Sequence, residues 1–545
     1  MKLLLPILIF LTVLTSCSTE CQNNFLNNYN RRSVSYSATG NSYDVFYPEY
    51  DGKATYLTVN VDNLESQDVY FIFSNVSMDQ SDSNPTVSGH SASEIRDQIS
   101  RQLIANTTYD KPTSRGSTVT PLRDTVGQTE RFWIQQNNSD AVILKPCTCL
   151  KTVEVGEKQL SVWKQNSLSS ITDEMAQTIA DTFMRSGDDN DIYDWVTNIY
   201  GEEWGEHNSS NLIEPNNNIT ILLVDDEADG STITLGYFWS KDNYTTEEQS
   251  NSNKRIMFYV NGNFYAKIKE NFKEQKWKAS NICPATIHST LAHEFQHMIH
   301  FYNKIVKNEN TTLSSTWLNE MCSLVTEDFV ADKLGVYGPR GRKTAECTYY
   351  HNLYNNLGIK SSEDYNIGRI PYFNDYNDRL PIFGWGSSDS AYRYSIAYAF
   401  GAYLARNYGG PQLFRDIVQD KTVSDSVIFT LTGSNLETLL RKWGVACMLS
   451  SLTEVENGLK YNNGSSWMMY EIDGISYNLG SINLFNYVSS PNIYTATSSS
   501  ERSIGSSYSL GTCTNRYARA AERKTGTLKK YVKLESHTAL TIVVR

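Results

Sequence analysis

The sequence has no long basic run, and its 48 lysines and arginines are outnumbered by 60 acidic residues. The formal net charge of −12 repels the phosphate backbone of nucleic acids, so we expect no nucleic-acid partner. The chain also has no internal repeat and no heptad array. These absences leave a protein or a peptide as the expected partner. Nothing in the sequence indicates an oligomeric state.

Long apolar runs are missing as well. The stretch from Leu3 to Leu14 is too short to cross a bilayer as a mature helix. It ends in Leu14-Thr15-Ser16-Cys17, which resembles a bacterial lipobox, where residues 1–16 are a signal peptide and the Cys17 thiol receives a diacylglycerol. An ordinary secretory signal cleaved nearby is the alternative. We therefore expect a bacterial protein of the cell envelope, lipid-anchored at the outer membrane or the periplasmic face, or an extracellular one.

Cysteine is scarce, with nine in 545 residues. Apart from Cys17, an even number remains in a compartment that can be oxidising, so disulfides are possible, although their pairing cannot be read from the sequence. The spacing of Cys147 and Cys149 is too tight for a structural zinc knuckle, and no matching pair of Cys or His lies near. We therefore expect structural cysteines without a metal.

The length exceeds that of one typical core and predicts two or three domains. Residues 17–41 are rich in Asn, Ser and Tyr without periodicity, as in a flexible tether behind a lipidated cysteine. Short β-branched and aromatic segments between turn residues predict a β-rich N-terminal module at 42–151 and a small β-rich C-terminal module at 456–545. Residues 152–455 mix helices and strands and form the expected central domain.

Two kinds of hydrophobic pattern occur within residues 152–455. The continuous apolar run at 219–224 predicts a strand buried on both faces, and residues 255–260 predict a further strand. Apolar residues three or four apart predict a helix at 286–305. Further helices are predicted at 171–184, 315–333, 394–407 and 436–452, the last opened by a capping-box pattern.

The pattern His293-Glu294-Phe295-Gln296-His297 is the strongest chemical signal. Residues four apart share one face of a helix, so both imidazoles can bind the same metal ion, and Glu294 can reach a water on that ion. His300 follows one turn later, but three successive helical positions do not easily converge on one ion. The pattern predicts a Zn²⁺ site with Glu294 as the general base, and a surface helix with satisfied histidines is the alternative.

A catalytic zinc takes three protein ligands and keeps a fourth position for water. The metzincin pattern requires Gly at position 300 and His at position 303, where this sequence has His300 and Asn303, so that class is excluded. A glutamate from a second helix is the other arrangement, and Glu320 stands at the head of the helix expected at 315–333. Glu320 is therefore the predicted third ligand.

Partners for the ligand imidazoles are expected on the same helix. Glu327 lies two turns beyond Glu320 and can accept a hydrogen bond from a ligand ring, which fixes the tautomer and orientation of the ring. Asp328 is the fallback for that role. Asn319 is the second candidate partner.

The segments HEFQHMIHFYNK and WLNEMCSLVTED resemble those of the gluzincins, most of all the hyicolysin-type bacterial metallopeptidases. The resemblance covers roughly residues 150–455 and includes Gly236-Tyr237-Phe238. Met321 and Cys322 depart from it, where Gly and a small or apolar residue are more usual, but neither has a ligand role. The resemblance implies an α+β multidomain fold, with a gluzincin-like catalytic domain of mixed sheet and helical subdomain between the two β-rich modules.

The resemblance also implies a catalytic tyrosine. In the aminopeptidase branch of the gluzincins, a tyrosine at the start of a helix that ends in Gly-Gly-Pro donates a hydrogen bond to the oxyanion. Tyr394 stands at the matching distance before Gly409-Gly410-Pro411, with Tyr392 and Tyr398 as rivals. The G-x-M-E-N motif of that branch is absent, which favours an endopeptidase.

The expected function is hydrolysis of peptide bonds in proteins or peptides by a secreted zinc lipoprotein. An extended substrate is expected to add to an exposed strand edge, with residues 255–260 as the candidate strand. One alternative is a catalytically inactive surface lipoprotein that binds host or matrix proteins, but Glu294 is intact. Another is a structural zinc, but two His and one Glu leave a coordination position open.

A second metal has a weaker basis in the sequence. Asp225, Glu227, Asp229 and Gly230 resemble the start of a Ca²⁺ loop, but the twelfth position, where an acidic ligand is required, is Gly236. A solvated turn is the simpler interpretation. The same holds for the acidic run at 188–191.

Overall fold

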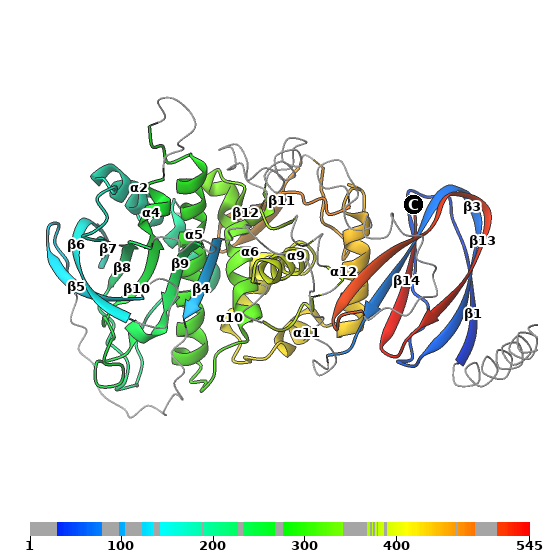
Figure 1. Cartoon of the computed structure of the whole chain (residues 1–545), viewed down its shortest axis with the longest axis horizontal. Helices are drawn as coiled ribbons and strands as arrows, with labels where there is room; N and C mark the ends of the chain where they lie inside the picture. The colour runs from blue at the N-terminus through cyan, green and yellow to red at the C-terminus, as the bar shows by residue number, and fades with distance from the viewer. Residues whose placement is uncertain are drawn as a thin grey trace, which may run out of the picture.

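The computed structural model describes residues 30–545 except 79–97, 104–121, 136–141, 188–189, 227–232, 268–275, 342–367, 371–372, 374–376, 379, 386–389, 465 and 486–509. Figure 1 shows an elongated molecule with one sheet at each end and helices between them. The α+β class predicted from the sequence is confirmed. Leu3–Leu14 and Cys17 lie outside the described residues. Among the helices that are described, none is both long and apolar enough to span a membrane.

A seven-stranded mixed sheet forms one end of the molecule, in the order β4-β9-β10-β8-β7-β6-β5. Strand β8 coincides with the apolar run predicted at 219–224, and every one of its residues is buried. It lies between β7 and β10 and pairs in parallel with both. The strands are β4 (Gln98–Leu103), β5 (Thr129–Gln135), β6 (Val142–Val155), β7 (Lys158–Gln165), β8 (Asn218–Val224), β9 (Ile233–Trp239) and β10 (Ile256–Asn261).

The expectation that residues 255–260 form an exposed strand edge is wrong. Strand β10 pairs in parallel with β8 on one side and antiparallel with β9 on the other. All six of its residues are buried, as is typical of an interior strand. No edge of β10 is therefore open to an extended peptide.

The helices predicted in the central region are all present, with small shifts of their ends. The helix predicted at 286–305 begins earlier, and its last turn is a π-helix, η2 (Tyr302–Lys307). In α12 the cap is Asn435 and not Ser434 of the predicted capping box: the Asn435 side chain accepts a hydrogen bond from the Thr438 N–H at 2.8 Å. The helices are α2 (Asp173–Phe183), α3 (Ile192–Tyr200), α4 (Gly262–Tyr265), α5 (Ile282–Phe301), α6 (Thr316–Leu334), α9 (Ser390–Asn407), α10 (Pro411–Gln419), α11 (Ser426–Thr432) and α12 (Leu436–Leu449), with the 3₁₀ turns η1 (Ser240–Asn243) and η3 (Gly338–Arg340).

Helix α5 lies at the centre of the helical region. It packs on β9 and β10 of the seven-stranded sheet and on α6, which in turn packs on α9. One continuous apolar core joins these elements to α2, α3 and α12. A small hairpin of β11 (Met468–Ile472) and β12 (Ile475–Leu479) covers part of α6. The site helices are thus held on several sides by the main core.

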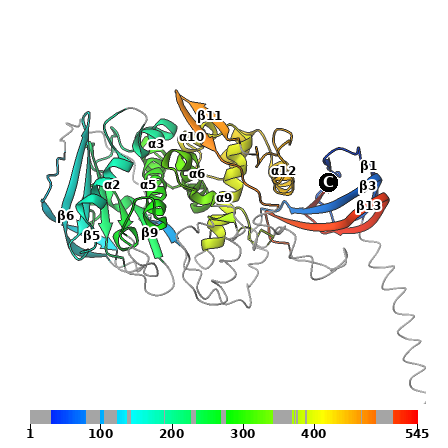
Figure 2. The same cartoon turned by 90° about the horizontal axis from the view of Figure 1, so that it is seen from above.

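The second sheet combines the two ends of the described chain. The long strands β3 (Thr55–Asn75) and β13 (Thr514–Leu534) pair antiparallel along most of their length. Strand β14 (Thr538–Val544) pairs with β3 and with β2 (Asp44–Phe46), and this sheet has an apolar core of its own. Figure 2 shows α12 between this sheet and the other helices, and α12 contacts β3, β13 and β14.

This pairing differs from the predicted modules in two ways. Strands expected in separate N- and C-terminal modules form one sheet, whereas β5 and β6, expected in the N-terminal module, belong to the seven-stranded sheet. Part of the segment expected as a tether at 17–41 is a strand, because β1 (Asn30–Ser37) pairs in parallel with β3; residues 17–29 lie outside the described residues. The joining of the two modules has a physical reason: β13 and β14 lie more than four hundred residues after β3, and local patterns do not specify such a distant partner.

Candidate metal centre

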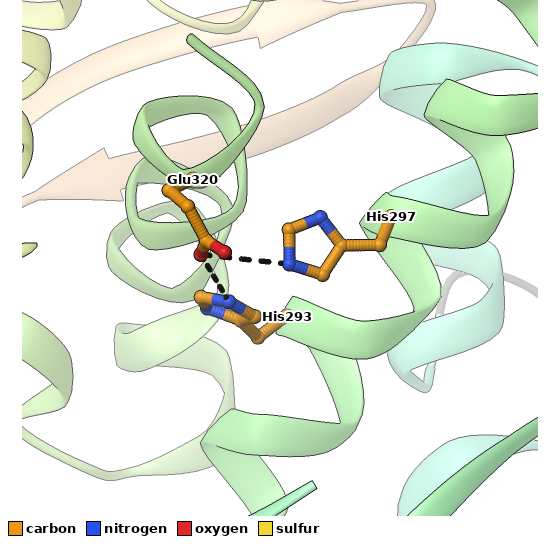
Figure 3. Close-up of side chains that lie close together, drawn as sticks. All are labelled: His293, His297 and Glu320. Carbon is orange, nitrogen blue, oxygen red and sulfur yellow. Dashed lines mark hydrogen bonds and ion pairs between the residues drawn. The ribbon is translucent and has the colours of Figure 1, made fainter. Parts of the chain in front are cut away.

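Helix α5 presents His293 and His297 from one face into a closed interior. The exposed fractions are 1% for His293 and 0% for His297. Nε2 of His293 lies 3.2 Å from Oε2 of Glu320, and Nε2 of His297 lies 3.6 Å from the same oxygen. Figure 3 shows the three side chains converging from two helices. One possible ligand atom from each residue lies within 4.8 Å of the other two, so a single ion can be held between them.

Helix α6 supplies Glu320 and also fixes the second nitrogen of His293. Glu327, two turns beyond Glu320, accepts a hydrogen bond from Nδ1 of His293 at 2.8 Å. The two glutamates thus hold opposite nitrogens of one ring. This contact leaves Nε2 of His293 as the ligand atom, because Nδ1 carries the proton that Glu327 accepts.

His297 is oriented by two side chains of α6. Its Nδ1 lies 3.1 Å from Oδ1 of Asn319 and 3.0 Å from Oγ of Ser323. The Ser323 hydroxyl also donates to Oε1 of Gln296. The sequence indicated Asn319 but not Ser323, although Ser323 follows Glu320 by three positions and therefore shares its helical face.

The charges of the site indicate a position for a cation. Burial by itself would lower the pKa of His293, but its hydrogen bonds to Glu320 and Glu327 raise it to about 10. Burial likewise opposes ionisation of Glu320, yet the adjacent His297 and His293 bring its pKa below its usual value. The buried carboxylates stabilise a proton on the His293 imidazole, and a metal ion can take the place of that proton. Two His and one Glu with a fourth position open fit a catalytic zinc.

Glu294 lies beside these ligands and against strand β9. A Cβ at Gly236 of β9 would lie 3.1 Å from Cγ of Glu294 and 2.9 Å from Cγ2 of Thr290. The same Cβ would lie 2.9 Å from the carbonyl oxygen of Tyr259, which belongs to β10. Glycine therefore allows α5 to approach the sheet at the residue that follows His293.

Tyr394 lies at the site, whereas its rival Tyr398 lies elsewhere. The hydroxyl of Tyr394 is within hydrogen-bonding reach of Glu320, and burial followed by the charge of Glu320 raises the pKa of Tyr394. The hydroxyl of Tyr398 instead donates to Oδ2 of Asp328 at 3.2 Å. Asp328 also forms an ion pair with Arg406 at 2.8 Å, so neither Tyr398 nor Asp328 holds a ligand ring. Tyr392, the other rival, is half-buried.

The remaining metal candidates do not join this cluster. Nε2 of His300 lies 2.8 Å from Oγ of Ser314, and its Nδ1 faces Gln296. Most of the calcium candidate loop lies outside the described residues. Within the described part of the chain, His293, His297 and Glu320 form the one group that could hold a metal. No disulfide joins the cysteines described there, which are Cys147, Cys149, Cys283, Cys322, Cys447 and Cys513.

Comparison with known families gives a match over most of the chain. Residues 147–544 match the family Peptidase M30. The chain belongs to this peptidase family. The M30 match extends past residue 455, the expected end of the catalytic domain, to the last strand, β14.

A curated relative and a solved structure are also similar to the chain. The chain is 26% identical over 267 residues to the neutral metalloprotease ShpI of Staphylococcus hyicus, which confirms the resemblance to the hyicolysin type. The aligned region covers 48% of this chain and 49% of ShpI, so the chain spans about half the length of that relative. The M1 zinc metallopeptidase of Deinococcus radiodurans is 12% identical, with coverage of 72% of this chain and 64% of that chain and a TM-score of 0.26.

Proposed function

We propose that this protein is a zinc metallopeptidase that hydrolyses peptide bonds in proteins or peptides. The observation that carries the proposal is the convergence of the His293 and His297 Nε2 atoms on the carboxylate of Glu320. Membership of the M30 family and similarity to a neutral metalloprotease support the same activity. The proposed ligands are His293, His297 and Glu320.

Zinc at these ligands would polarise the scissile carbonyl and lower the pKa of the attacking water. Glu294 takes the proton of that water and later delivers it to the leaving amine. Tyr394 donates its phenolic hydrogen to the carbonyl oxygen as negative charge develops there. Its pKa is raised by burial, so the phenol keeps the proton that it needs for this hydrogen bond.

The proposal includes an endopeptidase mode of cleavage and a secreted, lipid-anchored state. The lack of a G-x-M-E-N motif supports the first, because that motif is the amine-binding motif of the aminopeptidase branch. The sequence Leu14-Thr15-Ser16-Cys17 supports the second. Metabolic labelling with a radioactive fatty acid tests the anchor, and equal labelling of wild type and Cys17→Ala would contradict it.

The decisive experiment compares wild type with Glu294→Gln, with zinc content and casein hydrolysis measured on the same samples. We expect one zinc per chain in both proteins and loss of hydrolysis in the variant only. Retained zinc with unchanged hydrolysis would rule out Glu294 as the base. Wild type that takes up no stoichiometric zinc would rule out the site, and wild type that binds zinc without hydrolysing casein or peptides would favour a binding lipoprotein.

A further inference from the structure

Arg369 lies beside the metal centre, although no sequence motif marks it. Its guanidinium carbon lies 5.2 Å from the centre of the Tyr394 ring, a cation–π distance. Trp385 packs edge-on against the same ring, with centroids 4.9 Å apart and planes at 90°. Tyr394 itself is 2% exposed. Two side chains therefore fix the ring whose hydroxyl reaches Glu320.

The backbone of Arg369 is attached to the helix that carries the site glutamates. The Arg369 N–H donates to the carbonyl oxygen of Pro339 at 2.7 Å. Gly368 adopts a φ of +61°, and a Cβ there would lie 2.4 Å from the same oxygen. The turn η3, which contains Pro339, packs on α6, and a Cβ at Gly338 would lie 3.3 Å from the Glu327 carbonyl oxygen. The position of Arg369 is thus fixed relative to Glu320 and Glu327.

The charge of Arg369 also acts on a carboxylate of the site. Burial raises the pKa of Glu327, but His293, Ser289 and Arg369 together hold it below its usual value. The same guanidinium that lies over the Tyr394 ring thus lowers the pKa of a carboxylate beside His293.

We infer that Arg369 is a positioning residue of the proposed peptidase reaction, holding the Tyr394 ring so that its hydroxyl meets the developing oxyanion. The inference rests on the proposed function. Arg369 acts through Tyr394 and does not contact the substrate, so its removal should lower kcat and leave KM unchanged. Lysine cannot replace it fully, because an ammonium group lacks the planar face that stacks on an aromatic ring.

The test is a double-mutant cycle with Arg369→Met and Tyr394→Phe, measured as kcat and KM on a peptide substrate. Arg369→Met should lower kcat about tenfold, the size of a buried cation–π contact, with KM unchanged. Tyr394→Phe lacks the hydroxyl, so adding Arg369→Met to it should change kcat less than twofold. Arg369→Lys should regain part of the loss, since it restores the charge without the stacking.

Two measurements besides activity separate positioning from a merely structural role. Zinc content should stay near wild type in Arg369→Met. A phosphinic peptide, which mimics the tetrahedral species, should bind Arg369→Met about tenfold more weakly than wild type. Arg545→Met is the matched control, because Arg545 stacks on Phe485 at 3.8 Å and contacts Met448 and Ser451, none of which belongs to the site.

Additive losses in the cycle would overturn the inference, and so would wild-type kcat in zinc-loaded Arg369→Met. If Arg369→Met does not fold, Arg369→Lys alone decides, because a positioning role requires a reduced kcat at full zinc content. Failure of the proposed function looks different: wild type itself would then be inactive. In that case the urea midpoints of four metal-free proteins are compared: wild type, Arg369→Met, Tyr394→Ala and the double variant. Additive shifts of the midpoint would exclude the Arg369–Tyr394 contact.

Discussion

The hydroxyl of Ser323 lies 3.0 Å from Nδ1 of His297, while Nε2 of the same ring faces Glu320. Because the Ser323 hydroxyl also donates a hydrogen bond to Gln296 of α5, it holds the His297 ring in a fixed orientation relative to that helix. Mutation of a side chain that orients a metal ligand typically lowers metal affinity by about 10- to 100-fold. One small residue can thus influence the whole centre.

Ser323→Ala is expected to weaken zinc binding about tenfold and no more, because Asn319 still holds Nδ1 at 3.1 Å. The measurement is competition with a chromogenic chelator. Ser450→Ala is the control, since the buried Ser450 hydroxyl accepts the backbone N–H of Leu484 at 2.8 Å and touches no ligand. Equal zinc affinity of Ser323→Ala and wild type would contradict the orienting role.

Gly236→Ala is expected to lower both the melting temperature and kcat. The added methyl group would meet Thr290, Glu294 and the backbone of Tyr259, and the strand backbone cannot give way. Overpacking of this kind lowers the free energy of unfolding by about 1–3 kcal/mol. Here it would also displace Glu294, the proposed base. Adding Thr290→Ser removes one of the three contacts and should restore part of the stability. A wild-type melting temperature and kcat in Gly236→Ala would show that α5 approaches β9 less closely.

Zinc uptake at neutral pH is expected to release a proton. The carboxylates of Glu320 and Glu327 raise the pKa of His293 to about 10, so its ring is protonated in the metal-free protein, and zinc must displace one ring proton. Zinc affinity should therefore fall as the pH is lowered from 9 to 6. Calorimetry in buffers of different ionisation enthalpy measures the proton count. Glu327→Gln removes one cause of the raised pKa and should weaken this pH dependence, whereas an unchanged dependence would contradict the assignment.

Acid should destabilise the fold through His288. Burial lowers the pKa of His288 to about 4, so the folded protein keeps its ring neutral while the unfolded chain gains a proton below about pH 6.5. The unfolded state then binds more protons, and stability is lost as the pH falls from about 6.5 to 4, by up to about 3 kcal/mol. No described group hydrogen-bonds to Nε2 of His288. His288→Leu should give a flatter dependence of the urea midpoint on pH, and an equally steep one would place the acid sensitivity elsewhere.

The parts of the site that depend on helical spacing could be predicted from the sequence. His293 and His297 are four residues apart on one helix, and Glu320 and Glu327 lie two turns apart on the next. Local periodicity determines which of these side chains share a face. Ser323 could have been found in the same way, because it occupies the same face of α6 as Glu320.

Other features depend on contacts between distant segments and could not be predicted. A backbone hydrogen bond from Arg369 to Pro339 holds Arg369 beside the site, and no local pattern specifies that contact. The interior position of β10 is an intermediate case. Its unbroken apolar run already favoured burial on both faces, but its neighbours β8 and β9 had to be known before an exposed edge could be rejected.

The sheet shared by the two ends of the chain has a consequence for folding. Strand β3 obtains its longest partner only when β13 is present, more than four hundred residues later in the sequence. Contacts of such high contact order form slowly, since a long loop must close before they stabilise anything. A chain that emerges N-terminus first therefore carries β3 without its longest partner until residues 514–534 have been made. Completion of this sheet is then a late event that requires β13 and β14.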